Sequence, residues 1–304
     1  PFVSTAPVDR PIRGNLNNGS VSLTVSGSDL TPGRWYVVPS NNSVQELELE
    51  ITARITVGNP GFVPERNSYG PINRNISQGI EYNRVGNNFG VAFFTYARNG
   101  APVTYLGAGA LAQGDSVLAH GPLNAFVGVP GDQEGMPVGY IGLTFLSAQE
   151  VILSYDLMGE SGSERLGTIA QLSCPQRNGQ DLNVTGHWTP EALGGGGTAL
   201  LVNESNQAYV FYFFDNEGIQ RWLLANSPDT FLSNPAADAR QFRGDCPTCS
   251  PTSPRQDIVG TITHQFDNDD QGQQTVNVNL VQPLSGSIQF TRDLFKLTDT
   301  NLCQ

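Results

Sequence analysis

The sequence is poor in charge, and above all in lysine. Only 14% of its 304 residues are charged, and Lys296 is the single lysine among 16 basic residues. The 28 acidic residues leave a net charge of −12. Nucleic acids and anionic membrane surfaces both attract clusters of basic residues, which this chain lacks. We therefore expect neither of them as a partner.

Long hydrophobic runs and histidines are also scarce. The longest apolar runs, such as Ala208 to Phe214, have the length of a strand and fall short of the roughly 18 residues of a membrane helix. The three histidines are His120, His187 and His264, and none has a second histidine or a carboxylate at metal-ligand spacing. The nucleophile motif G-x-S-x-G is missing as well. We expect no membrane insertion and no enzyme.

Glycine and proline, in contrast, are plentiful, with 34 and 20 residues. Apolar residues recur in short runs between turn residues, as is typical of antiparallel β-proteins. Leu47, Leu49 and Ile51, for example, alternate with glutamates in the two-residue period of a strand. No segment shows a convincing helical period. The composition and the pattern together predict an all-β fold.

A β-rich unit occurs twice. The stretch from Gly79 to Tyr105 aligns without a gap within the stretch Gly197 to Leu224, at an offset of 118 residues. Further on, 138–145 matches 259–266 at an offset of 121, and each copy ends in another hairpin. Shared landmarks in the same order indicate a duplication. We predict two tandem antiparallel repeats, barrel- or sandwich-like, at 61–174 and 175–304, with roughly six or seven strands each.

Two long segments interrupt the matched strands. They run from Gly107 to Pro137 in the first copy and from Asn226 to Asp257 in the second. Neither shows a clear strand pattern, and we expect irregular structure in both. Loops of this length are often functional or packed across the mouth of a barrel.

Residues 1–60 form a distinct opening unit, a short β extension. Strands are predicted at Ser20–Val25, Arg34–Val38 and Glu46–Val57, which is too little for a large core of their own. The first of these alternates and carries no charge, so it suits addition to the sheet edge of a neighbouring subunit. The candidate assembly residues are Ser20, Val21, Leu23 and Val25.

Four cysteines are present. Cys174 closes the first repeat, Cys303 closes the second, and Cys246 and Cys249 share a C-P-T-C loop. An even number in an exported protein suggests disulfides, in one of three pairings. We predict a Cys246–Cys249 bridge and a Cys174–Cys303 bridge. A redox or zinc role for C-P-T-C is less favoured, because prolines follow where a helix would have to begin and further zinc ligands are missing.

The second copy reads G-H-W-x-P-E…G-G-G…Y-x-F-F-D-N-E-G-x-x-x-W-L. This pattern resembles a repeat module of exported proteins of Gram-negative bacteria, G-x-W-x-x-P…S-G-x-G…W-[FY]-x-Y-D-x-x-G-x-x-x-W, which has no assigned activity. The resemblance extends from Gly61 to about Phe295 and implies an exported β-protein. The first copy departs from it, since Thr104 aligns with Trp222 and Ala97 with Asp215. A ligand site built on those two residues would be absent there.

Two groups of residues are candidate ligand sites. Three carboxylates beside a turn glycine suit Ca²⁺, which binds about six to eight oxygens, although the same residues are normal at a solvated hairpin tip. These carboxylates belong to Asp267, Asp269 and Asp270. Trp188 and Trp222 could stack on a sugar ring, although such residues more often fill β cores. No cofactor is expected apart from this possible calcium ion.

These observations predict a non-enzymatic structural protein that is secreted after a signal peptide is removed, since the chain begins at Pro1 without methionine. It would join copies of itself into a filament or surface matrix by addition of the N-terminal strand. One alternative is a carbohydrate-binding or adhesion module that binds surface glycans through Trp188 and Trp222. A second is a secreted hydrolase or lyase with an unrecognised site.

Overall fold

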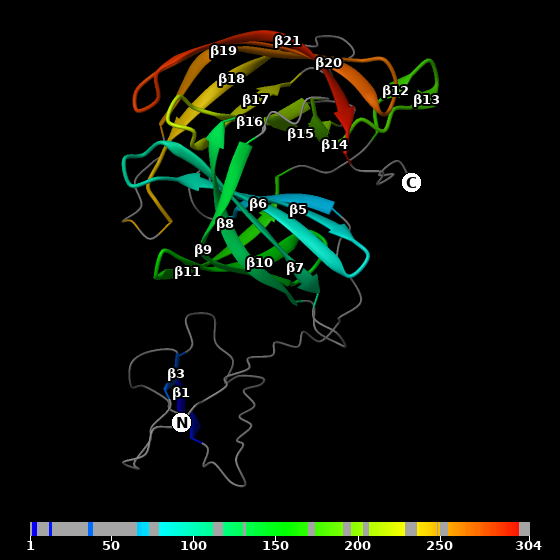
Figure 1. Cartoon of the computed structure of the whole chain (residues 1–304). Coiled ribbons are helices and arrows are strands. Elements are labelled where there is room, and N and C mark those ends of the chain that lie inside the picture. Colours follow the sequence, from blue (N-terminus) through cyan, green and yellow to red (C-terminus); the bar gives the residue numbers. More distant parts are fainter. Residues whose placement is uncertain are drawn as a thin grey trace. The chain divides into compact units, whose positions relative to one another are not determined.

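The structure, a computed structural model, describes residues 2–4, 12–13, 36–38, 66–72, 79–111, 118–129, 132–169, 174–190, 196–202, 207–228, 236–247, 249 and 255–297. Over these ranges the chain is all-β and has no helix, hence no helix able to cross a membrane. The chain divides into two compact units, Pro1–Arg54 and Ile55–Gln304 (Figure 1). The predicted all-β fold with two tandem repeats is confirmed.

The first unit contains a small antiparallel sheet. Its strand order is β2-β1-β3, with β1 at Phe2–Ser4, β2 at Ile12–Arg13 and β3 at Tyr36–Val38. Strand β3 lies within the predicted strand Arg34–Val38. The other two predicted strands lie outside the described residues. So do the candidate assembly residues Ser20, Val21, Leu23 and Val25.

The second unit consists mainly of two closed antiparallel barrels of eight strands each, and both lie within the predicted repeat limits. The first barrel comprises β4 (Arg66–Pro71), β5 (Gly79–Val85), β6 (Asn88–Tyr96), β7 (Pro102–Leu111), β8 (Leu118–Val129), β9 (Asp132–Phe145), β10 (Glu150–Leu157) and β11 (Glu160–Thr168). Each strand pairs with the next, and β11 closes the barrel by pairing with β4.

The second barrel repeats this order. It comprises β14 (Gly186–Thr189), β15 (Gly197–Val202), β16 (Gln207–Phe214), β17 (Gln220–Ser227), β18 (Ala236–Arg243), β19 (Arg255–Phe266), β20 (Gln271–Leu280) and β21 (Gly286–Lys296). A short hairpin precedes it, formed by β12 (Gln176–Arg177) and β13 (Gln180–Asp181).

The same backbone irregularity occurs in both barrels. Gly139 in β9 and Gly260 in β19 have φ angles of 153° and 149°, and the strand register shifts beside each of them. An added Cβ would lie 1.8 Å from a backbone oxygen at Gly139 and 2.0 Å at Gly260. Such β-bulges bend a strand and increase its twist, which helps a sheet to close. The shared bulge supports a duplication, because its two glycines are 121 residues apart, the offset seen in the sequence.

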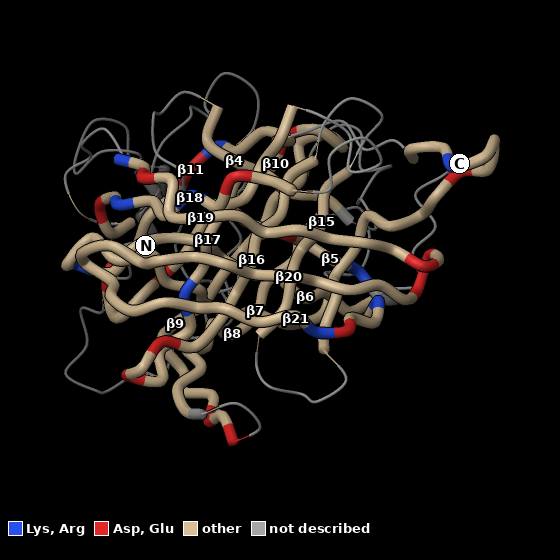
Figure 2. Tube along the Cα trace, turned by 90° about the horizontal axis from the view of Figure 1, so that it is seen from above, with Lys and Arg blue, Asp and Glu red and all other residues tan. Residues whose placement is uncertain are grey.

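Each barrel has its own hydrophobic core. Alternate residues point inward, as β20 shows most clearly in its strict alternation of exposed and buried side chains. Tyr69, Tyr82, Phe93 and Phe145 are among the fully buried residues of the first core. Figure 2 shows that most charged residues lie at turns and strand ends rather than along the barrel walls.

The two segments that we expected to be irregular each contain a barrel strand. Strand β8 lies within 107–137 and β18 within 226–257, so the repeats have eight strands instead of six or seven. Glycine and proline interrupt the apolar pattern of β8, while the inward residues of β18 include small alanines. Pairing with neighbouring strands on both sides overrides these weak local signals.

Equivalent strands join the two barrels. A third apolar cluster lies between β6 and β7 of the first barrel and β16, β17 and β18 of the second. Phe94 stacks on Tyr212, with ring centroids 6.1 Å apart and planes 11° apart. These two residues are 118 positions apart and therefore occupy the same place in the two repeats. The barrels thus meet through the same face, as the subunits of a symmetric dimer do.

Candidate functional site

The structure buries the two tryptophans that we considered as a sugar platform. Trp188 is 1% exposed inside the second barrel, and its indole N–H donates to the carbonyl of Val184 at 2.8 Å. Trp222 is 3% exposed between the barrels and donates to the carbonyl of Thr95 at 3.0 Å. Neither ring presents a face to a sugar, so the platform is not formed. Both residues fill cores, as large aromatic residues in β-proteins commonly do.

The acidic loop at the β19–β20 turn is organised by its own hydrogen bonds. Asn268 Oδ1 accepts from the backbone N–H groups of Asp270 and Gln271, both at 2.9 Å. Asp269 Oδ1 accepts from the N–H of Asn183 at 3.0 Å. Within the described ranges, no group of three or more His, Cys, Asp or Glu side chains is placed to hold a metal ion. The geometry therefore gives no support to calcium at Asp267, Asp269 and Asp270.

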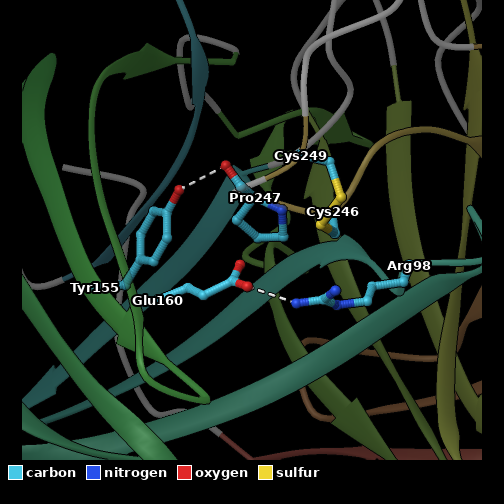
Figure 3. The surroundings of a disulfide bond; sticks show 6 residues. All are labelled: Arg98, Tyr155, Glu160, Cys246, Pro247 and Cys249. Atoms are coloured by element: carbon cyan, nitrogen blue, oxygen red, sulfur yellow. Dashed lines mark hydrogen bonds and ion pairs between the residues drawn. A yellow bond between two sulfur atoms is a disulfide. The ribbon is translucent and has the colours of Figure 1, made fainter.

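The predicted local disulfide is present. Cys246 and Cys249 are bonded, with Cα atoms 5.0 Å apart. Their loop, between β18 and β19, reaches the first barrel, where the hydroxyl of Tyr155 donates to the carbonyl of Pro247 at 3.0 Å (Figure 3). Cys174 is also disulfide-bonded, and its predicted partner Cys303 lies outside the described residues. The C-P-T-C motif is thus a structural bridge that packs one barrel against the other.

A polar cluster also joins the barrels. His187 from β14 places Nε2 2.8 Å from Glu81 Oε1 and 2.8 Å from Asn83 Nδ2, both on β5. Its Nδ1 lies 2.9 Å from the hydroxyl of Tyr212. The side chain of Glu81 is 1% exposed and that of His187 is 20% exposed. A buried carboxylate is costly without a hydrogen-bonded partner, and the imidazole supplies one.

The hydrogen positions in this cluster follow from its geometry. Nε2 of His187 carries a proton, because it lies within hydrogen-bonding distance of the Glu81 carboxylate. Asn83 therefore faces Nε2 with its amide oxygen Oδ1, and the N–H of the imidazole gives this buried oxygen a hydrogen-bond donor. A tyrosine–histidine–carboxylate series can relay protons. Here it also ties one barrel to the other.

Within the described residues, the second barrel closes through only two residue pairs. Strand β14 is short and pairs with β21 at only two positions, Trp188 with Lys296 and Thr189 with Phe295. On the other side, β20 pairs with β21 along Gly286–Phe295. Within the described residues, the outer edge of β21 from Gly286 to Leu294 therefore has no strand partner. Unpaired edges of this kind are templates for strand addition.

The residues of β21 that point into the barrel beside this edge are half-buried. They are Ile288, Phe290 and Arg292. The guanidinium carbon of Arg292 lies 4.6 Å from the ring centroid of Phe290 and 5.8 Å from that of Phe211. Nε and Nη2 of Arg292 both donate to Gln274 Oε1, at 3.1 and 2.9 Å. Burial lowers the pKa of Arg292 to about 10, so it remains charged at neutral pH.

Behind Arg292, the barrel interior holds further polar groups. Gln274 Nε2 lies 2.6 Å from Thr198 Oγ1 and 2.9 Å from His264 Nε2. Burial lowers the pKa of His264 to about 3, with the charge of Arg292 adding to the effect, so the ring is neutral. The ring of Tyr209 packs 4.3 Å from that of His264, and burial raises the pKa of this tyrosine. The interior of this barrel is thus partly polar.

The sequence contained few signals for these two sites. His187 and Glu81 are far apart in the chain and meet only when the barrels pack. Arg292 did carry a signal, because it stands in the inward period of β21 between Phe290 and Leu294, where an apolar residue is expected. A charged residue in such a period is a candidate for function.

The chain matches no protein-family model, no curated protein and no solved structure. The resemblance of its repeats to an exported bacterial module therefore stays a prediction. The candidate functional site is the edge of β21 from Gly286 to Leu294, which has no strand partner among the described residues, with Arg292 beside it.

Proposed function

We propose that the protein is a non-enzymatic, extracellular structural subunit that assembles with copies of itself by strand addition. The observation that supports this proposal is the edge of β21, which has no strand partner from Gly286 to Leu294 within the part of the chain that the structure describes. In an assembly, the alternating segment Ser20–Val25 of one copy would pair with this edge in the next. Backbone hydrogen bonds would supply affinity, and alternate side chains would supply specificity.

The chemistry of β21 fits an incoming strand. Its outward residues Ser287, Gln289, Thr291 and Asp293 are polar and exposed, as suits the solvent face of an extended sheet. The inward residues Ile288 and Phe290 are apolar and half-buried. Val21, Leu23 and Val25 have the same two-residue period and would cover them. Head-to-tail contacts of this type produce filaments when they do not close.

Other features suit an extracellular role. A structural disulfide persists in oxidising compartments. Lysine and charged residues in general are scarce, so few side chains could form ion pairs with a second copy. A contact through the backbone is therefore favoured. The alternative role in glycan binding depended on Trp188 and Trp222, and both side chains are buried.

The proposal is tested by blocking either partner of the contact. One variant lacks residues 1–25, and a second carries Ile288→Lys, because a lysine beside an edge opposes strand addition. The matched control is Asn277→Lys, an exposed position on β20, which is paired on both sides. Assembly is followed by light scattering and electron microscopy.

We expect the wild type and Asn277→Lys to form filaments, and the other two variants to remain folded monomers. Normal assembly without residues 1–25 would refute the donor, and normal assembly of Ile288→Lys would refute the acceptor. A wild type that stays monomeric under all conditions would refute the proposal as a whole.

A further inference from the structure

Among the described residues, Arg292 has no acidic partner, although the chain carries an excess of 12 negative charges. Other inward or buried cations do have acidic partners, as in the Arg221–Asp215 ion pair at 2.6 Å. A half-buried guanidinium flanked by two phenylalanine rings has lost part of its hydration. It therefore interacts favourably with an anion that can reach it.

The hydrogen bonds that Arg292 makes with the described residues use only one edge of the guanidinium. A guanidinium has five N–H donors, and Nε and Nη2 each direct one to Gln274 Oε1. Both N–H groups of Nη1 and the second N–H of Nη2 remain. Together they form the fork that binds a carboxylate through two parallel hydrogen bonds. Gln274 fixes this orientation, since its amide is itself held by Thr198 and His264.

A glycine adjoins that fork. Gly196 lies next to the guanidinium, and a Cβ added there would be 3.4 Å from Nη1 of Arg292 and 3.0 Å from the carbonyl oxygen of Tyr212. The absence of a side chain at this position therefore keeps the free edge of Arg292 uncovered by residue 196. Phe211 and Phe290, with ring centroids 6.1 Å apart, form an apolar wall beside it.

Two deeper groups in the same barrel lack hydrogen-bond partners. Because Gln274 donates to His264 Nε2, the proton of the neutral imidazole resides on Nδ1, and this atom has no partner among the described residues. The hydroxyl of Tyr209 has none either. Both side chains are at most 1% exposed. Unsatisfied buried polar groups are rare and indicate a missing polar guest, either water or a ligand.

The first barrel provides an internal comparison. Strand pairing places Glu164 opposite Leu153 and Arg292 opposite Gln274, and Leu153 and Gln274 are 121 residues apart. Glu164 therefore occupies the position of Arg292, and Gly162 that of Phe290. Arg292, Gln274 and Phe290 are thus present together in the second barrel. At the equivalent positions, the first barrel has none of these residue types. The fold does not require them.

We propose that the second barrel binds a small organic acid whose carboxylate pairs with the free fork of Arg292 and whose apolar body, aromatic or aliphatic, contacts Phe211 and Phe290. This site goes beyond the proposed assembly function. It concerns side chains inside the barrel, whereas assembly uses mainly the backbone edge of β21. The two share Phe290, so binding is measured on the unassembled protein.

The test uses the full-length protein under conditions where sedimentation shows a single species. Isothermal titration calorimetry measures binding of 3-phenylpropionate, and the uncharged control probe is 3-phenylpropanamide. The central variant is Arg292→Gln. Arg292→Lys keeps the charge but lacks the fork, and Arg165→Gln removes an exposed arginine of the first barrel as a matched control. Circular dichroism checks that each variant is folded.

We expect the wild type and Arg165→Gln to bind the acid and to bind the amide much more weakly. Arg292→Gln should weaken binding of the acid by about 10- to 100-fold, the range for a lost charge-assisted hydrogen-bond pair, and Arg292→Lys by less. Equal binding of acid and amide by the wild type would overturn the proposal without any variant. So would unchanged affinity in Arg292→Gln, or no binding of the acid in the low millimolar range. Assembly is scored separately, so failure of either proposal is distinguishable.

Discussion

Replacing Trp222 by alanine should uncouple the two barrels while leaving each of them folded. The indole is 3% exposed and belongs to the cluster between the barrels, not to either barrel core. Its ring contacts Phe94, Tyr96 and Phe242, at centroid distances of 6.0, 5.7 and 5.8 Å. Each barrel keeps a separate core without it. The loss should therefore appear as reduced coupling between two cooperative units.

The magnitude can be worked out from these contacts. A buried aromatic side chain removes about 150–250 Å² from water, which at about 25 cal/mol per Å² corresponds to roughly 4–6 kcal/mol as an upper limit. Alanine recovers a part of this, and truncations of buried tryptophan cost about 3–5 kcal/mol. Trp222→Phe keeps most of the apolar contact but loses the hydrogen bond to Thr95. It should cost only about 1–2 kcal/mol.

Urea denaturation followed by near-ultraviolet circular dichroism and by tryptophan fluorescence tests this prediction. We expect the transition of Trp222→Ala to broaden or split, because the barrels then unfold in separate steps. Trp188→Ala is the control, since this ring lies inside the second barrel and its loss should destabilise that barrel alone. If Trp222→Ala unfolds in one sharp transition within about 0.5 kcal/mol of the wild type, the size of a typical surface substitution, the cluster does not couple the barrels.

Three further predictions concern buried groups. The pKa of His264 is about 3 in the folded protein against an ordinary value of 6.5, so the unfolded chain binds more protons between these values and stability falls as pH is lowered through this window. The loss from pH 7 to pH 4 should reach at most about 3 kcal/mol, and His264→Gln should remove it in urea titrations at several pH values. Gly260→Ala should lower the stability measured by thermal denaturation by more than about 2 kcal/mol, because its Cβ would meet a backbone oxygen. The control Gly142→Ala, at a position with room for a Cβ, should change stability by less than about 1 kcal/mol. Equal effects of the two substitutions would contradict the bulge geometry. His187→Ala should lower the free energy of unfolding by about 1.5–3 kcal/mol, because it removes a partner of the buried Glu81 carboxylate. In a double-mutant cycle, this loss should be smaller when Glu81 is already replaced by glutamine. Additive effects would show that the pair is not coupled.

Much of the barrel architecture could be predicted from local patterns. The repeated β-rich stretch identified in the sequence contains β5, β6 and the start of β7 in the first copy and β15, β16 and the start of β17 in the second, and the two offsets indicated the duplication. The 121-residue offset also corresponds to the pair of bulge glycines, Gly139 and Gly260. These features depend on residues that are close together in the chain.

Features that depend on tertiary packing could not be predicted. Strands β8 and β18 have weak local patterns and form because both neighbours supply hydrogen bonds. Trp222 has the residue type of a ligand platform, and only the face of the first barrel that packs on it shows that it is core. The pairing of His187 with Glu81 needs both barrels in place. Arg292, in contrast, could have been identified, because its charge breaks the apolar period of β21.

The stacking of Phe94 on its own counterpart Tyr212 has a consequence for the origin of the chain. A contact between equivalent positions is what a homodimer of single barrels would make across its two-fold axis. Fusion of two gene copies would then have preserved that dimer inside one polypeptide. After fusion, the two halves could diverge independently, and the position held by Thr104 in the first copy is held by Trp222 in the second. A single barrel expressed alone should accordingly pair with itself through this aromatic face.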